Sequence, residues 1–162
     1  MTIHIRQAVL SDLHALVQIE AICFPPAEAA SKEHLQERLK AFKESFFVAE
    51  KDGEIIGFIN GAIVNETVIS DAMFEDVTFH DPNGLYQSIF GLDVLPSYQH
   101  QGIATQLMNH MIASSKTAGR KGLILTCKEA LIPFYSRFGY VNQGISLSAH
   151  GGATWYDMTL LF

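Results

Sequence analysis

Several features that mark particular protein classes are scarce in this sequence of 162 residues. Only two cysteines occur, Cys23 and Cys127, and neither belongs to a Cys-x-x-Cys pair, so we expect reduced thiols and no disulfide framework. Lysine and arginine form no cluster and the net charge is −6, which argues against a nucleic-acid partner. No apolar run approaches the roughly 20 residues that a membrane span needs.

Two further absences concern targeting and phosphate binding. The first residues show no basic segment followed by an apolar core, so no signal peptide is apparent and we expect a cytoplasmic protein that does not insert into a membrane. Neither G-x-x-x-x-G-K-[ST] nor a complete G-x-G-x-x-G with a suitably spaced acidic residue is present, which leaves nucleotide-binding folds of those types unsupported.

The composition itself is that of a compact globular chain. Apolar residues make up 48% and charged residues 17%, a ratio that allows a sizeable core at this length. No internal repeat or linker divides the sequence, so we expect a single domain over residues 1–162. The stretch 65–84 is acidic and contains His80, but its spacing matches no zinc or calcium pattern, and we interpret it as a solvated loop without a metal.

Apolar periodicity predicts helices after a short first strand. Ser11 is a candidate N-cap for a helix that Pro25–Pro26 ends, and Ser31 is a candidate N-cap for a second helix. On the first helix Glu20 lies among apolar residues, either as a carboxylate at the edge of the stripe or as a catalytic group.

The middle of the chain predicts a hairpin. Apolar runs at 46–50 and 54–62 flank Asp52-Gly53, a strong turn signal, and Gly57 and Gly61 indicate a bulge or a close backbone approach. Further on, we expect a buried strand at 121–127, a helix at 129–138 ended by Gly139, and a closing strand at 153–160. The fold class is therefore α/β (α+β), a mixed sheet with helices on both faces.

The rest of the chain is organised around residues 89–111. An apolar strand at 89–94 leads through a polar loop containing Gly102 into a helix whose Ile103, Leu107 and Met111 form one apolar stripe. Free N–H groups and the positive end of the helix dipole make such a junction suited to a phosphate, although a glycine there can also serve turn geometry alone.

Two motifs carry a resemblance to a known family. The pattern Gln99-x-x-Gly102-x-Ala104 resembles the [RQ]-x-x-G-x-[GA] acetyl-CoA loop of the GNAT acyltransferase superfamily. About thirty residues later, the run 130–140 contains Phe134-Tyr135 and Gly139-Tyr140 and is similar to that superfamily's F-Y-x-x-x-G-[FY] helix. The run 127–139 resembles the serotonin (arylalkylamine) N-acetyltransferase branch. The resemblance implies a GNAT-type, mostly antiparallel central sheet and acetyl-CoA as the cofactor.

The resemblance also implies roles for individual residues. Tyr135 is expected to protonate the leaving sulfur, although periodicity alone would also fit a core aromatic, and the backbone N–H of Val94 is the expected oxyanion donor. In the linker after the first helix, Phe24, Pro25 and Glu28 are expected to contact the acceptor substrate. The expected cofactor contacts are Leu92, Asp93, Val94, Gln99, His100, Gln101, Gly102, Ala104, Thr105 and Phe134.

One departure from the branch concerns the general base. Vertebrate serotonin N-acetyltransferases carry two histidines on the central strand, and the matching positions here are Ser88 and Phe90. Neither side chain is a base at neutral pH, so the candidates are a water chain through Ser88, or Glu28, His80 or Asp93.

The resulting hypothesis is an acetyl-CoA-dependent N-acetyltransferase in which a small primary amine attacks directly in a ternary complex. An arylalkylamine is the acceptor that the resemblance suggests, while a polyamine, an aminoglycoside and a protein N-terminus stay open. A non-catalytic CoA-binding sensor is the alternative, and the sequence leaves open whether the protein is a homodimer.

Overall fold

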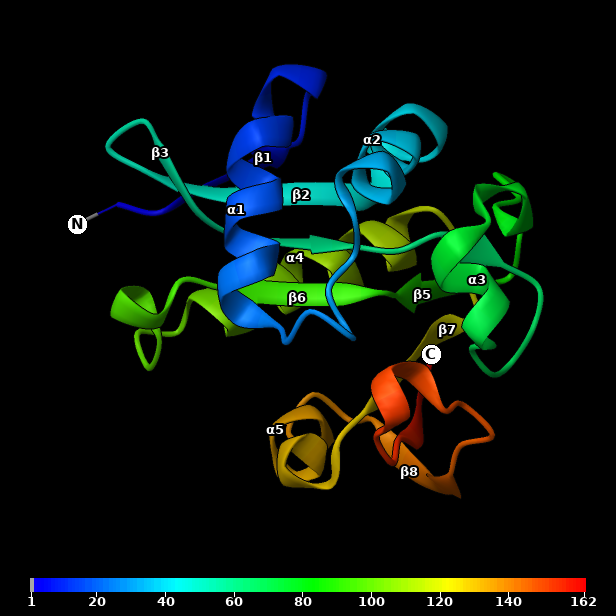
Figure 1. Ribbon diagram of the computed structural model, residues 1–162. Helices are drawn as coiled ribbons and strands as arrows, with labels where there is room; N and C mark the ends of the chain where they lie inside the picture. Colours follow the sequence, from blue (N-terminus) through cyan, green and yellow to red (C-terminus); the bar gives the residue numbers. More distant parts are fainter. Residues whose placement is uncertain (1) are drawn as a thin grey trace.

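The computed structural model describes residues 2–162, which form two sheets with helices packed against them (Figure 1). The first sheet has the order β1-β2-β3-β6 with every pair antiparallel, and the second has the order β4-β5-β7-β9-β8 with a parallel β5–β7 pair. The strands are β1 His4–Gln7, β2 Phe46–Lys51, β3 Glu54–Asn60, β4 Ile63–Val64, β5 Tyr86–Ile89, β6 Gly91–Val94, β7 Gly122–Cys127, β8 Val141–Ile145 and β9 Tyr156–Leu161. This is the mixed, mostly antiparallel arrangement that the sequence predicts.

The helices α1 (Leu13–Cys23) and α2 (Lys32–Ala41) cover one face of the first sheet, and α4 (Ile103–Thr117) lies behind the other (Figure 1). Each face has its own core because neighbouring residues of a strand point to opposite sides. On β3, Phe58 packs with the residues of α1 and α2, whereas Ile59 belongs to the core that contains Met111 of α4.

The predicted strand at 89–94 is interrupted at Phe90. Residues up to Ile89 belong to β5, which pairs with β4 and β7, whereas Gly91 begins β6, which pairs with β3. The two halves of the predicted strand, β5 and β6, therefore belong to different sheets. As a result β6 is the last strand of the first sheet, and a gap opens between β6 and β7.

The predicted hairpin is confirmed as β2 and β3. Its register shifts between Ala49, which faces Gly57, and Glu50, which faces Ile55, so β3 carries a one-residue bulge beside Gly57. The predicted close approach is found at Gly61, where an added Cβ would lie 1.8 Å from the Ser88 carbonyl oxygen.

Ser31 caps α2 as predicted, since its Oγ accepts a hydrogen bond from the His34 N–H at 3.2 Å. The prediction that Ser11 caps α1 is wrong. A 3-10 turn over Leu10–Asp12 precedes α1, and the Asp12 carboxylate accepts the Val9 N–H at 2.9 Å.

The interpretation of residues 65–84 as a solvated loop is only partly right. This stretch contains the short helix α3 (Asp71–Glu75), and its Ile69 and Met73 are buried in a core shared with Phe42 and Ile124. Among residues 2–162, no group of three His, Cys, Asp or Glu side chains is arranged to hold a metal.

The C-terminal part follows the prediction with two differences. The predicted helix at 129–138 consists of a 3-10 turn and the short helix α5 (Ile132–Ser136), and Gly139 adopts φ +104° after it. The edge strand β8 was not expected, because its exposed residues do not alternate with buried ones. In the described part of the chain, no helix combines the length and apolar character that a membrane crossing requires.

Candidate active site

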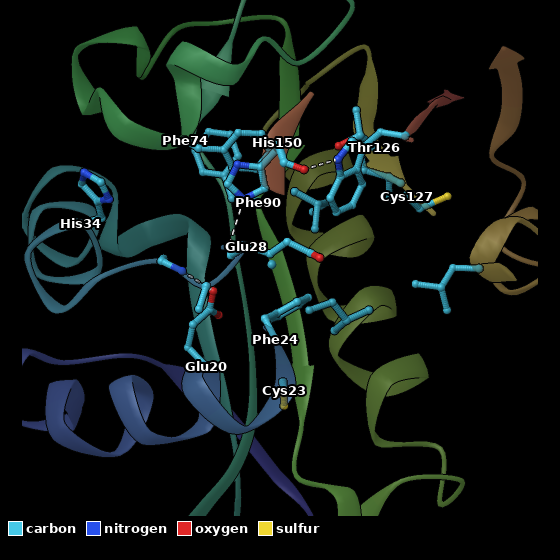
Figure 2. A pocket seen from close by; sticks show the side chains of 18 of the residues that line it. Glu20, Cys23, Phe24, Glu28, His34, Phe74, Phe90, Thr126, Cys127 and His150 are labelled. Carbon is cyan, nitrogen blue, oxygen red and sulfur yellow. Dashed lines mark hydrogen bonds between the residues drawn. The ribbon is translucent and has the colours of Figure 1, made fainter. Parts of the chain in front are cut away.

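Two cavities meet in the gap between β6 and β7. The first cavity, of about 410 Å³, lies between the α1–α2 loop, β6, β7 and the segment before β9 (Figure 2). The second cavity, of about 570 Å³, lies between β6, the start of α4 and α5. Both are lined by Leu92, Val94, Gln99, Leu131 and Tyr135, so these five residues mark the place where they join.

The backbone of Val94 faces this junction. The neighbouring Leu95 N–H donates to the Ile56 carbonyl across the β3–β6 ladder at 2.9 Å. Because alternate residues of an antiparallel strand turn their N–H groups to opposite sides, the Val94 N–H points away from β3. Since β6 has no further neighbour in its sheet, that N–H is directed into the gap, as an oxyanion donor requires.

The second predicted group at the junction is Tyr135, which α5 holds in a buried position with edge-on contacts to Phe134 and Tyr140. Burial raises the pKa of Tyr135 well above its usual value, so the phenol stays protonated and can act as a donor. Cys127 lines the first cavity beside it, and burial raises the pKa of its thiol to about 11. This thiol is therefore not a ready nucleophile.

The loop before α4 has the geometry of an anion site. Gly102 is the N-cap residue with φ +80°, and the Gln106 N–H makes the first intrahelical bond, to the Gly102 carbonyl. The N–H groups of Ile103, Ala104 and Thr105 consequently have no partner within the helix. Predicted cofactor residues that line the second cavity are Leu92, Val94, Gln99, His100, Gly102, Ala104, Thr105 and Phe134.

Two predicted cofactor residues lie elsewhere. The Gln101 side chain is exposed and donates to the Ser97 carbonyl at 3.4 Å. Asp93 does not line the second cavity, because its side chain lies on the opposite face of β6, toward α1 and α2. Arg137, which the sequence analysis missed, does line that cavity; it belongs to the variable part of the F-Y-x-x-x-G motif and carried no signal of its own.

The α1–α2 loop supplies one wall of the first cavity, as predicted for Phe24 and Glu28. The Glu28 Oε2 accepts a hydrogen bond from Lys128 Nζ at 2.8 Å, while its Oε1 is buried without a partner. Pro25 does not line this cavity, and its carbonyl accepts the N–H groups of Glu28 and Ala29, which shapes the loop.

A group of aromatic side chains occupies one end of the first cavity (Figure 2). Phe74 stacks on His150 with ring centroids 4.9 Å apart and lies 5.2 Å from Phe90. Trp155 lines the same cavity and donates its indole N–H to the His150 carbonyl at 2.8 Å. These residues come from three distant segments, and no local pattern indicates that they meet.

Two candidates for the general base have structural hydrogen bonds instead of a place at the junction. The Ser88 hydroxyl is fully buried and donates to the Ala62 carbonyl at 2.7 Å, and it lines neither cavity. His80 is used structurally, since its Nδ1 accepts the Ile63 N–H at 3.0 Å. Glu20, for which an edge position and a catalytic role were both open, is buried and lines the first cavity.

The chain is similar in sequence to several known proteins. The model of the acetyltransferase (GNAT) family matches residues 13–140. The chain is 27% identical over 112 residues to serotonin N-acetyltransferase of Mesocricetus auratus, covering 67% of this chain and 51% of that protein. It is 28% identical over 143 residues to the probable hydrolase YhcX of Bacillus subtilis (strain 168), covering 83% of this chain and 27% of that protein. The chain thus spans about a quarter to a half of the length of these relatives.

Solved structures with the same fold have low sequence identity. The loading GNATL domain of CurA from Lyngbya majuscula superposes with a TM-score of 0.86 at 13% identity, covering 99% of this chain and 98% of that one. The PaiA N-acetyltransferase from Thermoplasma acidophilum, solved in complex with coenzyme A, gives a TM-score of 0.70 at 18% identity over 100% of both chains. With its family model matched over most of its length, the chain belongs to the GNAT family of acetyltransferases.

Proposed function

We propose that this protein is an acetyl-CoA-dependent N-acetyltransferase that acts on a small primary amine, with an arylalkylamine as the favoured acceptor. The observation that carries the proposal is the meeting of the two cavities at Leu92, Val94 and Tyr135. Two substrates that enter from opposite sides of the gap can react directly there, without a covalent enzyme intermediate.

The second cavity suits acetyl-CoA, which supplies an activated acetyl group as a thioester. The free N–H groups of Ile103, Ala104 and Thr105 and the positive end of the α4 dipole favour its pyrophosphate. Arg137 adds a positive charge to the lining of the same cavity. Neighbouring structures bound to CoA or acetyl-CoA, such as that of PaiA, support this assignment.

The chemistry needs two groups at the junction. The Val94 N–H donates to the carbonyl oxygen as negative charge develops on it. The protonated Tyr135 phenol donates to the leaving sulfur and then takes a proton from the nitrogen adduct. We assign the role of general acid to Tyr135 on this basis.

The first cavity suits an aromatic amine. Phe24, Phe74, Phe90 and Trp155 provide apolar and aromatic surface, and acidic side chains also line the cavity. The similarity to serotonin N-acetyltransferase of Mesocricetus auratus favours the same class of acceptor.

The test is thiol release from acetyl-CoA, assayed with tryptamine, phenethylamine, spermidine, an aminoglycoside and a short peptide. A saturable rate with an aromatic amine supports the proposal in full, and a preference for another amine corrects the acceptor class. Acetyl-CoA binding by calorimetry without turnover would favour the non-catalytic sensor. If acetyl-CoA does not bind, the assignment of the second cavity fails.

A further inference from the structure

A small polar niche opens beside Gly91, where the chain passes from one sheet to the other. A Cβ placed on Gly91 would lie 3.2 Å from Asp93 Oδ1, 3.4 Å from Asn60 Nδ2 and 3.8 Å from Glu20 Oε1. These three atoms come from β6, β3 and α1 and converge on the volume that the missing side chain leaves free. Gly91 and Glu20 both line the first cavity, so the niche is continuous with it.

The polar atoms that face the niche make no hydrogen bonds within the described part of the fold. Within residues 2–162, no N–H or hydroxyl group donates to either Asp93 oxygen, and Asn60 Nδ2 donates to no acceptor, although both residues are almost fully buried. Glu20 accepts the Ala30 N–H through Oε2 at 2.8 Å, and its Oε1 is the atom that faces the niche. Buried polar groups without partners are costly, which points to a ligand or a proton as their partner.

The charged groups around the niche determine the charge of the ligand that it can bind. Arg38 of α2 is buried and donates to Asn60 Oδ1 at 3.2 Å and to the Phe74 carbonyl at 2.8 Å. Glu37 on the same helix, Cys23 on α1 and Tyr135 on α5 are the other titratable groups that interact with this cluster. Two carboxyl groups and one guanidinium carry at most a net charge of −1, which one ammonium group or one proton neutralises.

We propose that the niche beside Gly91 receives the ammonium group of the acceptor amine and that the Glu20–Asp93 carboxyl pair takes its proton. In this assignment, which rests on the proposed acetyltransferase function, Glu20 is the catalytic base and Asp93 is a positioning residue that acts through Glu20. The pair fills the role that neither Ser88 nor His80 can perform.

The proton balance of the step is complete. An N–H bond of the ammonium breaks and an O–H bond forms on Glu20, which leaves a lone pair on nitrogen for attack on the thioester carbon. The nitrogen loses its second proton as the C–S bond breaks, and that proton reaches the leaving sulfur through Tyr135. The first proton passes from Glu20 through the first cavity to water, so each turnover releases one proton.

Glu20 lies close enough to Asp93 for its charge to affect the protonation of Asp93. Burial, and then the negative charge of Glu20, raise the pKa of Asp93 well above its usual value. Burial lowers the pKa of Arg38 to about 10, partly offset by Glu20 and Asp93, so the guanidinium remains charged at neutral pH. The pair is therefore a stronger base than a lone carboxylate beside an arginine.

The first experiment compares the 162-residue chain with its Glu20→Gln and Asp93→Asn variants. Each should lower kcat/KM for tryptamine at pH 7 by about 100-fold or more, and the rate should recover as rising pH supplies neutral amine from solution. Glutamine keeps an acceptor for the Ala30 N–H. Asp157→Asn is the matched control, because burial also raises the pKa of Asp157, yet this residue of β9 lines neither cavity.

A second variant tests the niche without changing a charge. Gly91→Ala places a methyl group among the three polar atoms and should raise KM for tryptamine about tenfold, with KM for acetyl-CoA unchanged. Calorimetry of tryptamine binding to the acetyl-CoA complex provides a readout that needs no turnover, and Gly91→Ala and Glu20→Gln should both weaken it.

The outcomes separate this inference from the proposed function. If tryptamine is acetylated and the Glu20, Asp93 and Gly91 variants retain the wild-type pH profile and KM, the niche assignment is wrong. The proposed acetyltransferase function is then still supported. If tryptamine binds in a niche-dependent way but is not acetylated, the niche stands and the proposed reaction fails. If tryptamine and phenethylamine neither bind nor react, the niche assignment is overturned.

Discussion

The ammonium nitrogen of Lys128 lies 2.8 Å from Oε2 of Glu28 and joins two walls of the first cavity that are 100 residues apart in the chain. Glu28 belongs to the α1–α2 loop and its side chain is only 8% exposed, whereas Lys128 follows β7 and is 44% exposed. The lysine also lies over the Trp155 ring, 5.6 Å from its centroid. This contact holds the loop against the second sheet.

Replacement of Lys128 by methionine should therefore weaken both the fold and the cavity wall. It leaves both Glu28 oxygens without a partner, which we expect to lower the free energy of unfolding by about 1–2 kcal/mol. Urea denaturation measures this loss. Lys121→Met is the control, since Lys121 takes part in no ion pair of the described residues, and equal losses in the two variants would contradict the assignment.

The anion site before α4 can be tested with two glycines that share one conformation. Gly102 and Gly53 both have φ +80° and open space around the Cβ position, but only Gly102 lies at the second cavity. Valine at either position should lower the free energy of unfolding by a similar amount, about 1–2 kcal/mol, because a β-branched residue is strained at positive φ. Gly102→Val should in addition raise the Kd of acetyl-CoA at least tenfold, because its side chain and a shifted loop block the N–H groups of α4.

Calorimetry with acetyl-CoA distinguishes the two effects. The Gly53→Val protein should bind acetyl-CoA as the wild type does, despite its lower stability. Comparable loss of binding in both variants would mean that strain, and not the loop at Gly102, explains the result.

The strand, loop and helix of residues 89–111 were predictable because their information is local. A strand's apolar residues, a glycine with positive φ and a helical stripe lie within about twenty positions. The expected cofactor contacts between Gln99 and Thr105 come from the resemblance to the GNAT acetyl-CoA loop. The break at Phe90 was not predictable, since a pattern of alternation does not say which neighbour a strand pairs with. Ser88 was misplaced for the same reason: it lies on β5, not on the strand that lines the gap.

The first cavity was harder to predict because its parts are far apart in sequence. Phe74 and His150 belong to segments whose local patterns indicate loops, and the pattern of the predicted strand that contains Trp155 does not show what this side chain packs against. Arg38 lies on a polar helix and would ordinarily face solvent, yet α3 and Phe90 cover it. Buried charges of this kind depend on partners from other elements, and a sequence pattern does not show those partners.

The pair between Arg6 and Asp12 predicts how stability depends on pH. Arg6 donates two hydrogen bonds to the Asp12 carboxylate, at 2.8 and 3.0 Å. Burial tends to raise the pKa of Asp12, but the hydrogen bonds from Arg6 and the Val9 N–H outweigh it, and the pKa is lowered overall. A carboxyl group with a lowered pKa in the folded state stabilises the fold above about pH 4, and this contribution is lost as pH falls through the folded value.

Asp12→Asn should thus lower the free energy of unfolding by about 1 kcal/mol at pH 7, and the difference from the wild type should shrink below about pH 4. Urea denaturation at pH 7 and pH 3 measures it. Arg6→Gln removes the partner and should give the same dependence on pH. A difference that stays constant between the two pH values would rule out ionisation of Asp12 as its source.

The assignment of Tyr135 as the general acid predicts a loss of rate without a loss of cofactor binding. Tyr135→Phe removes only the hydroxyl and should lower kcat by about 100-fold or more, with the Kd of acetyl-CoA unchanged. Tyr140→Phe is the matched control, because this buried tyrosine contacts the Met108 sulfur at 3.5 Å and lines neither cavity. Burial keeps the Tyr135 phenol protonated, so kcat of the wild type should show no decline from phenol ionisation below pH 10. A decline of kcat below pH 10 that disappears in Tyr135→Phe would show that the phenol ionises too readily for this role. An unchanged kcat in Tyr135→Phe would show that Tyr135 is not the general acid.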